Sequence, residues 1–258
     1  MPRRTDGQPE EQTKGRARRR LSREERLPAD IAAILKHLED FLNGTDEEGR
    51  KVCDCTWGIY AFFDYDDEPI YVGQTYESLR TRIRRHLTNQ RTDAVAMHVL
   101  DPMEVAYIAV WPLWDLAGLT PEERMDLLNR AEYTAYEELT RQARVSKLLN
   151  EKAPAPTDLI DLPKMYKGVI VPDDIRQRLA HADERIARRA STIANLAQVA
   201  KERDVSLGLR ETLVTQAQRL ELLARRRLEE VRGETPSQEL LSETRRSGAE
   251  NADAESDD

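Results

Sequence analysis

The sequence predicts an α+β protein in which three short strands lie among helices and a pair of long helices follows. Two short apolar runs between Trp57 and Gly73 are separated by turn-forming residues, which is typical of neighbouring strands. Three segments before residue 150 place apolar side chains at helical spacing. From Asp173 to Val231, apolar residues recur at three- and four-residue steps, which indicates two further helices.

Charge is distributed unevenly along the 258 residues, although the net charge is only −8. Residues 1–26 hold nine Lys or Arg against five acids, whereas the segment from Glu234 onward holds eight acids against two arginines. We therefore expect a disordered basic arm over 1–26 and a disordered acidic tail over 233–258. For the arm, a solvated linker and a contact with nucleic-acid phosphate both remain open.

Cys53 and Cys55 are too close along the chain for an ordinary disulfide, and no second pair completes a zinc site. We interpret them as reduced thiols of a cytoplasmic protein. The sequence has no run of eighteen apolar residues, so no membrane span is expected. The basic N-terminus is not followed by the apolar stretch of a secretory signal.

Residues 27–55 are expected to form an N-terminal helix and a charged loop. The helix covers Leu27 to Asn43, and Gly44 follows it as a stop. Its apolar face comprises Ile31, Ile34, Leu35, Leu38, Phe41 and Leu42.

The first two strands lie on either side of the turn-forming residues 64–69. In the first strand, Ile59, Ala61 and Phe63 alternate with Tyr60 and Phe62, which predicts a half-buried strand. The second strand runs from Ile70 to Val72. Gly73 ends it and, lacking a Cβ, lets another group approach the backbone closely.

A basic helix follows, with Leu79, Ile83 and Leu87 on its buried stripe. Arg82 and His86 are four residues apart and share a flank of this helix, whereas Arg85 points towards solvent. The next segment, 88–99, is less regular. It contains Arg91, for which substrate contact and a solvated role are both open.

A third strand is predicted over Glu104–Trp114, followed by a helix that starts at Thr120 and runs to about Leu149. Thr120, Pro121 and Glu123 are the residue types of a capping box with proline at the first helical position. Glu132 lies on or beside the apolar stripe of this helix. Since an unpaired buried carboxylate costs several kcal/mol, Glu132 should have a partner, either a metal ion or another cation such as a buried arginine.

The remaining chain is predicted to be a linker over 153–172 and a helical hairpin or coiled coil over 173–232. Asp204 to Gly208 interrupts the helical pattern. An apolar seam from Ile175 to Val231 suggests a homodimer through these helices. The arginines at 225–227 are interpreted as a solvated face, with DNA or protein contact as the alternative.

Three short motifs carry a resemblance to a known family. They are Gly58-Ile59-Tyr60, Tyr71-Val72-Gly73 and the pair Arg82-x-x-x-His86. In this order and spacing they resemble the GIY-YIG nuclease superfamily, over a domain that we place at 56–152. The second motif is usually Tyr-Ile-Gly, and Val72 replaces that isoleucine.

The resemblance implies a small three-stranded antiparallel sheet flanked by helices, and a site that hydrolyses phosphodiester bonds. It implies Tyr60 as the general base, with Tyr71, Arg82 and His86 around the phosphate. Glu132 matches the family's glutamate that binds the catalytic divalent metal, Mg²⁺ (or Mn²⁺). Asn150 matches a later asparagine of the family, although a helix C-cap is an equally good interpretation.

These residue types suit phosphodiester hydrolysis. The planar guanidinium of Arg82 matches phosphate oxygens, and the Glu132 carboxylate is a hard ligand for one ion of the magnesium type. The Tyr60 phenol can take a proton from water if nearby cations lower its pKa from about 10. His86 can hydrogen-bond a phosphate oxygen or relay a proton. Gly73, Asn150, Arg85 and Arg91 are further candidates for substrate contact.

The sequence thus predicts a metal-dependent DNA endonuclease of restriction or defence, repair or recombination. The alternative is a non-catalytic nucleic-acid-binding or interaction protein that retains a nuclease fold. The presence of all five candidate catalytic residues argues against this alternative, because a scaffold would not need them.

Overall fold

The computed structural model describes residues 27–88, 99–145 and 147–234. The predicted basic arm over 1–26, Arg91 and the tail from 235 onward lie outside the described residues. The helices are α1 (Ala29–Leu42), α2 (Leu79–Leu87), α4 (Pro121–Gln142), α5 (Asp173–Leu179), α6 (Ala182–Glu202) and α7 (Leu207–Arg232). Short 3-10 helices are η2 (Val52–Asp54), η3 (Pro102–Glu104) and η4 (Trp114–Gly118), and the strands are β1 (Gly58–Phe63), β2 (Pro69–Thr75), β3 (Tyr107–Pro112) and β4 (Tyr166–Val169).

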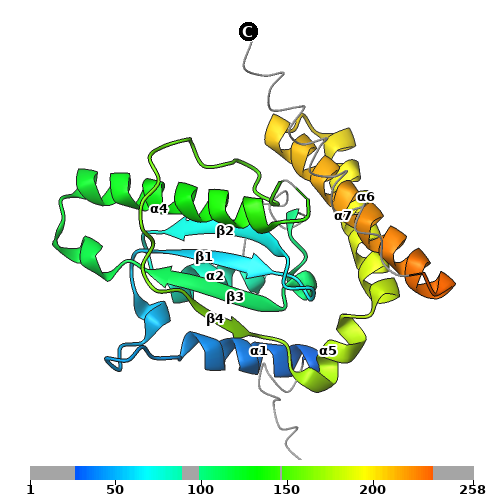
Figure 1. Cartoon of the computed structure of the whole chain (residues 1–258), viewed down its shortest axis with the longest axis horizontal. Coiled ribbons are helices and arrows are strands. Elements are labelled where there is room, and N and C mark those ends of the chain that lie inside the picture. The colour runs from blue at the N-terminus through cyan, green and yellow to red at the C-terminus, as the bar shows by residue number, and fades with distance from the viewer. Residues whose placement is uncertain (1–26, 89–98, 146, 235–258) are drawn as a thin grey trace, which may run out of the picture.

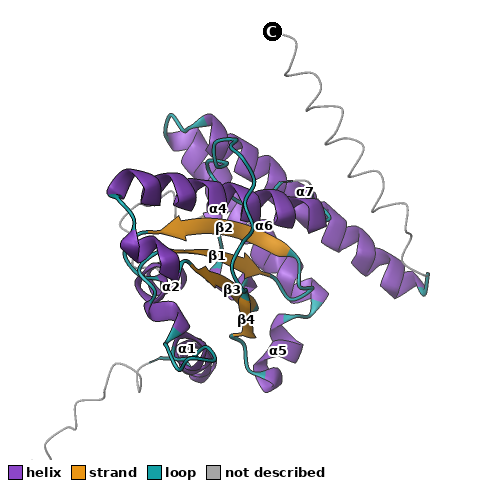
Figure 2. Cartoon of the chain, turned by 60° about the vertical axis from the view of Figure 1, so that its left-hand side comes forward, coloured by secondary structure: helices purple, strands orange, loops and turns teal. Residues whose placement is uncertain are grey.

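The four strands form one antiparallel sheet in the order β2-β1-β3-β4 (Figures 1 and 2). The prediction of three strands was therefore wrong by one. The fourth strand, β4, comes from the segment predicted as a linker over 153–172, and it pairs with β3 from Tyr107↔Val169 to Val110↔Tyr166. It gives the outer edge of β3 a hydrogen-bonding partner, which an open edge strand would otherwise lack.

Strand β1 is buried along its whole length, whereas the sequence predicted a half-buried strand. Tyr60 and Phe62 face a core cluster that also holds Leu79 and Ile83 of α2. The alternate residues of β1 belong to a second cluster with residues of α4, and Figure 2 shows α4 lying across the sheet. The strand is buried on both sides because helices cover both faces of the sheet.

Helix α4 begins as predicted and ends earlier than predicted. The Thr120 side chain accepts the N–H of Glu123, and the Glu123 carboxylate accepts the N–H of Thr120, so the capping box is confirmed. The helix ends at Gln142 rather than near Leu149. The predicted third strand is likewise shorter than expected, because Pro102–Glu104 form a 3-10 turn before β3.

The C-terminal helices α6 and α7 pack side by side as a hairpin at one end of the sheet (Figure 1). The predicted long first helix is broken at Ala180 and His181, which separate α5 from α6. Part of the predicted apolar seam is used within the chain, since Ile175, Leu196 and Leu209 are buried in the core. These residues are therefore not exposed to a second copy.

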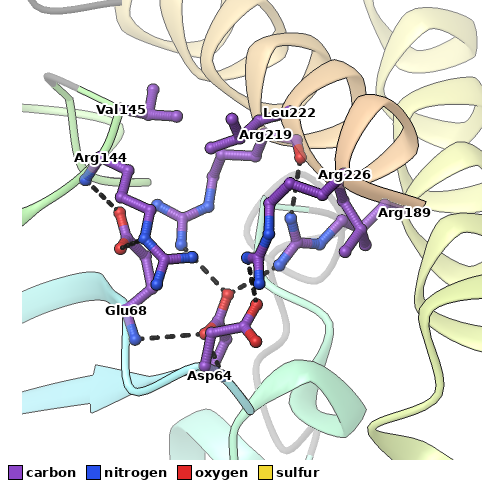
Figure 3. A pocket seen from close by; sticks show the side chains of 10 residues that line it. Asp64, Glu68, Arg144, Val145, Arg189, Arg219, Leu222 and Arg226 are labelled. Carbon is purple, nitrogen blue, oxygen red and sulfur yellow. Dashed lines mark hydrogen bonds and ion pairs between the residues drawn. The ribbon is translucent and has the colours of Figure 1, made fainter. Parts of the chain in front are cut away.

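A cluster of buried ion pairs joins this hairpin to the turn between β1 and β2; we call it the arginine cluster (Figure 3). Asp64 accepts hydrogen bonds of 2.8 Å from both Arg185 and Arg189. Arg189 also reaches Glu104, which precedes β3. Arg219 of α7 donates to the carbonyl of Pro69. The members of the cluster are Asp64, Asp66, Glu68, Glu104, Arg144, Arg185, Arg188, Arg189, Arg219 and Arg226.

The arginine cluster fixes the hairpin to the sheet by charge as well as by packing. Three deeply buried guanidinium groups, Arg185, Arg189 and Arg219, meet the buried carboxylates of Asp64 and Glu104. Removing one partner from such a network leaves an unpaired buried charge, which typically costs about 3–5 kcal/mol. The arginine at 226, predicted to be solvated, belongs to this cluster through Asp66.

Two further predictions concern small features of the chain. Cys53 and Cys55 are free and buried, and burial raises the pKa of the Cys53 thiol to about 12. Within the described residues, no helix has both the length and the apolar character needed to cross a membrane.

Candidate active site

The candidate site is an open hollow of about 470 Å³ beside β2, an edge strand of the sheet. Helices α2 and α4 cover opposite faces of the sheet, and their side chains meet around this edge strand. Arg82 comes from α2 and Glu132 from α4, and both line the same hollow. The hollow is lined by Tyr71, Gly73, Gln74, Thr75, Tyr76, Glu77, Arg82, Arg85 and Glu132.

Tyr60, Arg82 and His86 form a hydrogen-bonded chain beneath this hollow. Nε of Arg82 donates to the Tyr60 hydroxyl oxygen at 3.1 Å, and the same oxygen lies 3.0 Å from Nε2 of His86. Arg82 is the donor in its contact with the Tyr60 oxygen, and the tautomer of His86 decides which partner donates between Tyr60 and Nε2. The rings of Tyr60, Tyr71 and His86 pack together, with the Tyr71 and His86 centroids 5.2 Å apart.

Burial raises the pKa of Tyr60 well above 10, and nearby Arg82 only partly opposes this effect. The sequence-based expectation was a phenol whose pKa is lowered by cations. The direction found is the opposite, because the side chain is fully buried. Tyr60 is therefore a neutral phenol whose oxygen lies within hydrogen-bond distance of Nε2 of His86.

Gly73 connects the buried phenol to the hollow. A Cβ at this position would lie 2.6 Å from the Tyr60 hydroxyl oxygen, closer than any side chain allows. Gly73 itself lines the hollow, so the missing side chain leaves the Tyr60 hydroxyl directly behind the wall. The close approach predicted at this glycine is therefore made by the protein's own tyrosine.

Glu132 is a partly buried acid whose pKa is raised from 4.5 to about 7 by burial. A hydrogen bond from the backbone N–H of Gln74 and the charge of Arg82 oppose the rise without cancelling it. In the arginine cluster, by contrast, carboxylates are held by direct ion pairs to arginine. No ion pair within 4.0 Å joins Glu132 to a described residue, so its carboxylate is available to a cation in the hollow.

The donor set fits a single hard divalent cation. Among the described residues, no group of three His, Cys, Asp or Glu side chains is arranged to hold a metal ion. Magnesium-type ions commonly bind through one or two carboxylates and keep several of their waters. A single incompletely neutralised carboxylate at an open hollow meets that requirement.

Gln74 and Asn129 complete the site, and sequence reasoning missed them both. Nε2 of Gln74 donates to Oδ1 of Asn129 at 2.9 Å, whereas Oε1 of Gln74 is buried without a hydrogen-bond partner among the described residues. Asn129 lies three residues before Glu132, on the same face of α4. Gln74 and Glu132 also line a second hollow of about 400 Å³, with Lys152 and Asp126. The available signal was the position of Gln74, directly after the second motif.

Arg85 lies at the rim of the hollow. The sequence predicted that it points towards solvent, but its guanidinium is paired. Both terminal nitrogens of its guanidinium bind the carboxylate of Glu77. Tyr76, beside this pair, is 72% exposed. To contact a substrate, the Arg85 guanidinium must therefore either release the Glu77 carboxylate or bind the substrate in addition to it.

Asn150 holds the edge strand in place. Its Oδ1 accepts the N–H of Val72 and its Nδ2 donates to the carbonyl of Val72, at 3.2 and 2.8 Å. The neighbouring N–H of Leu149 donates to the carbonyl of Ile70. Asn150 is not a C-cap, because α4 ends eight residues earlier at Gln142. Its polar groups are thus used to cover the outer edge of β2, and we assign it a positioning role.

Comparison with known families decides the identity of this region. Residues 56–134 match the family model of the GIY-YIG catalytic domain. These residues form a GIY-YIG catalytic domain, the domain that defines the GIY-YIG nuclease superfamily. The match includes both tyrosine motifs, the pair Arg82 and His86, and Glu132. No curated protein and no solved structure matches the chain in the other two comparisons.

The GIY-YIG domain implies a nuclease-type function, and GIY-YIG nucleases generally depend on a divalent metal. The match stops before Asn150 and before the C-terminal hairpin. The roles of the individual residues and the nature of the substrate therefore rest on the geometry described above.

Proposed function

We propose that the protein is a metal-dependent DNA endonuclease that hydrolyses phosphodiester bonds at a one-metal site. One observation carries the proposal: Arg82 and Glu132, from helices on opposite faces of the sheet, line one open hollow. A phosphate needs a cation on its oxygens, and a metal ion needs a hard anionic ligand. The hollow offers both, and its volume lies in the usual range for ligand sites, about 300–1,000 Å³.

The hydrogen-bonded chain beneath the hollow supplies the proton acceptor. Tyr60 takes a proton from the attacking water while passing its own phenolic proton to Nε2 of His86. The phenol stays neutral throughout, which agrees with the raised pKa of Tyr60, and His86 ends as an imidazolium. Arg82 bonds Tyr60 through Nε, which leaves its terminal nitrogens for phosphate oxygens.

Glu132 would hold the divalent ion, either Mg²⁺ or Mn²⁺, with water and phosphate oxygens as its other ligands. When bound, such an ion stabilises the negative charge that develops on the phosphate. Tyr71 lies in the wall of the hollow against His86, where it orients the scissile phosphate. Gly73 keeps the wall thin between Tyr60 and the substrate.

The direct test is to incubate the purified protein with Mg²⁺ and single-stranded, duplex, branched and plasmid DNA, and to map the cut ends. We expect strand cuts that stop when the metal is removed with EDTA and that are lost in Arg82→Ala. Arg84→Ala, on the same helix and paired with Glu39 on the surface, is the matched control. Cleavage by Arg82→Ala at the rate of the unmodified protein would contradict the proposal.

The alternative function is a non-catalytic nucleic-acid-binding protein that retains the nuclease fold. The exposed Tyr76 beside the hollow gives it some support, because aromatic side chains can stack on bases. The two functions differ in one result: a scaffold binds DNA but produces no strand breaks with any divalent ion. Restriction or defence, repair and recombination are the settings that a DNA endonuclease of this family would serve.

A further inference from the structure

Helix α7 has two faces with different environments. One face packs against the rest of the chain and contains Leu209, Thr212, Thr215, Gln216, Arg219 and Leu223. Six residues on the other side of the helix are all exposed, and we call them the outer seam. The outer seam consists of Val214, Ala217, Glu221, Ala224, Leu228 and Val231.

The outer seam has the spacing of a coiled-coil interface. Its members are separated by alternating steps of three and four residues, which are the a and d positions of a heptad repeat. Val214, Leu228 and Val231 are 57%, 50% and 68% exposed. Single exposed apolar residues need no explanation, but a regular seam over about five helical turns is the pattern that binds another helix.

We propose that the outer seam binds the outer seam of a second copy of this chain, with the two α7 helices antiparallel. The first argument is volume. About a twofold axis between residues 222 and 223, the antiparallel layers pair Val214 with Val231, Ala217 with Leu228, and Glu221 with Ala224. The small side chains then face the large ones, which fills the interface evenly.

The second argument is charge. Within one copy, Glu221 accepts two hydrogen bonds from Arg225, at 2.9 and 2.7 Å, on the exposed surface. In the antiparallel pair, Arg225 of one copy borders the space that receives Glu221 of the other. Symmetry makes this pairing occur twice, so the acid in the middle of the seam is neutralised from both sides.

The same residues disfavour the parallel arrangement. A parallel pair would place Glu221 against Glu221 and would set Ala217 and Ala224 against themselves. Like charges in one layer repel, and paired alanines leave the seam underpacked. The sequence of α7 thus specifies the direction of pairing as well as the surface.

This surface differs from the seam predicted over Ile175–Val231, of which a substantial part is buried within the chain. The outer seam extends over 17 residue steps, or about 26 Å of helix. It has only three large apolar residues, so we expect a modest, concentration-dependent association. Because the arginine cluster fixes α7 to the sheet, the pairing would hold two GIY-YIG domains in a defined relation.

The first experiment measures the mass of the full chain by sedimentation velocity over a wide concentration range. We expect the mass to rise from one copy to two, and Leu228→Glu to remain a single copy. Leu159→Glu is the matched control, because Leu159 is 55% exposed but lies outside α7. Circular dichroism checks that Leu228→Glu keeps its helices. A single copy of the unmodified chain at every concentration would overturn the proposal.

The second experiment tests the direction of pairing by exchanging charges. Glu221→Lys and Arg225→Glu should each weaken association by about tenfold or more, because each creates like charges between the two copies. The double variant carrying both changes should recover the original affinity, since opposite charges meet again. In a parallel pair the double variant would set Lys against Lys, and its failure to recover would overturn the antiparallel arrangement. Nuclease activity has no part in either measurement.

Discussion

The hollow beside β2 and the arginine cluster contain the same kinds of side chain in opposite circumstances. In the arginine cluster, Asp64 is bound by the guanidinium groups of Arg185 and Arg189. In the hollow, Glu132 accepts one backbone N–H and interacts with the charge of Arg82 without forming an ion pair. Burial raises its pKa to about 7. An acid that its own protein neutralises holds the fold together, whereas an acid left without an ion pair is available to a ligand.

The difference also explains why burial alone does not identify a functional residue. Three carboxylates of the arginine cluster, Asp64, Glu68 and Glu104, are buried, whereas Glu132 is only partly buried. Their pairing removes any need for an external ion. The variants below test this contrast from the largest expected effect to the smallest.

The most damaging single change should be Asp64→Asn in the arginine cluster. The amide keeps the shape of the side chain and can still accept the N–H groups of Asp66 and Glu68, but it leaves Arg185 and Arg189 without their shared charge. We expect the free energy of unfolding, measured in urea, to fall by about 3–5 kcal/mol. Asp67 is an exposed neighbour that pairs with Lys167. In Asp67→Asn, the free energy of unfolding should therefore fall far less. Equal losses would mean that the cluster is not special.

Glu132→Gln should have the opposite effect: it should reduce DNA cleavage and leave the stability of the fold intact. Cleavage of DNA with Mg²⁺ should drop by about 10²–10³-fold, comparable to the loss of a main transition-state contact. The free energy of unfolding in EDTA should not fall, because a desolvated charge is removed. Glu138→Gln, on the exposed side of α4, serves as the control for both measurements. A variant that is destabilised and yet cleaves normally would assign Glu132 to the fold.

Asn150→Ala should affect both properties, because it acts on the strand that forms the wall of the hollow. The variant loses both hydrogen bonds between the Asn150 side chain and the backbone of Val72. The N–H and the carbonyl of Val72 then lack this side-chain partner. We expect a loss of about 1–3 kcal/mol in the free energy of unfolding, together with a smaller loss of cleavage than in Glu132→Gln. Unchanged stability would show that the edge of β2 does not depend on this side chain.

The smallest effect is a pH dependence of stability. Because the pKa of Glu132 is raised above its ordinary 4.5 to about 7, the folded protein binds this proton more tightly than the unfolded chain does. Its favourable contribution is complete below pH 4.5 and is lost as the pH rises to about 7. The unmodified protein should therefore lose stability relative to Glu132→Gln as the pH rises through this range. In EDTA, the melting temperature of Glu132→Gln minus that of the unmodified protein should increase with pH. A constant difference would contradict the raised pKa.

Local signals made much of the domain predictable. The capping box at Thr120 and Glu123 and the stripe of Leu79 and Ile83 depend on neighbours along the chain, and the structure confirms both. The four residues of β4 were missed, because their strand character depends on pairing with β3. No pattern within Tyr166–Val169 reveals a partner that is some sixty residues away.

The arginine cluster was missed for a related reason. Arg185 and Arg189 lie on the same face of α6 as the buried Leu196, but arginines on a helix are normally solvated. Only their distant acids, Asp64 and Glu104, make burial possible. The site residues were gathered by motif order, whereas Gln74 and Asn129 became visible only once β2 and α4 were placed together.

The central claim is that Glu132 is the metal ligand of a nuclease site. Calorimetric titration of Mn²⁺ into the unmodified protein and into Glu132→Gln, without DNA, tests it most directly. The account predicts that the unmodified protein binds one ion, that Glu132→Gln binds none at the same concentrations, and that Glu138→Gln behaves as the unmodified protein. Equal binding by the unmodified protein and Glu132→Gln would contradict it.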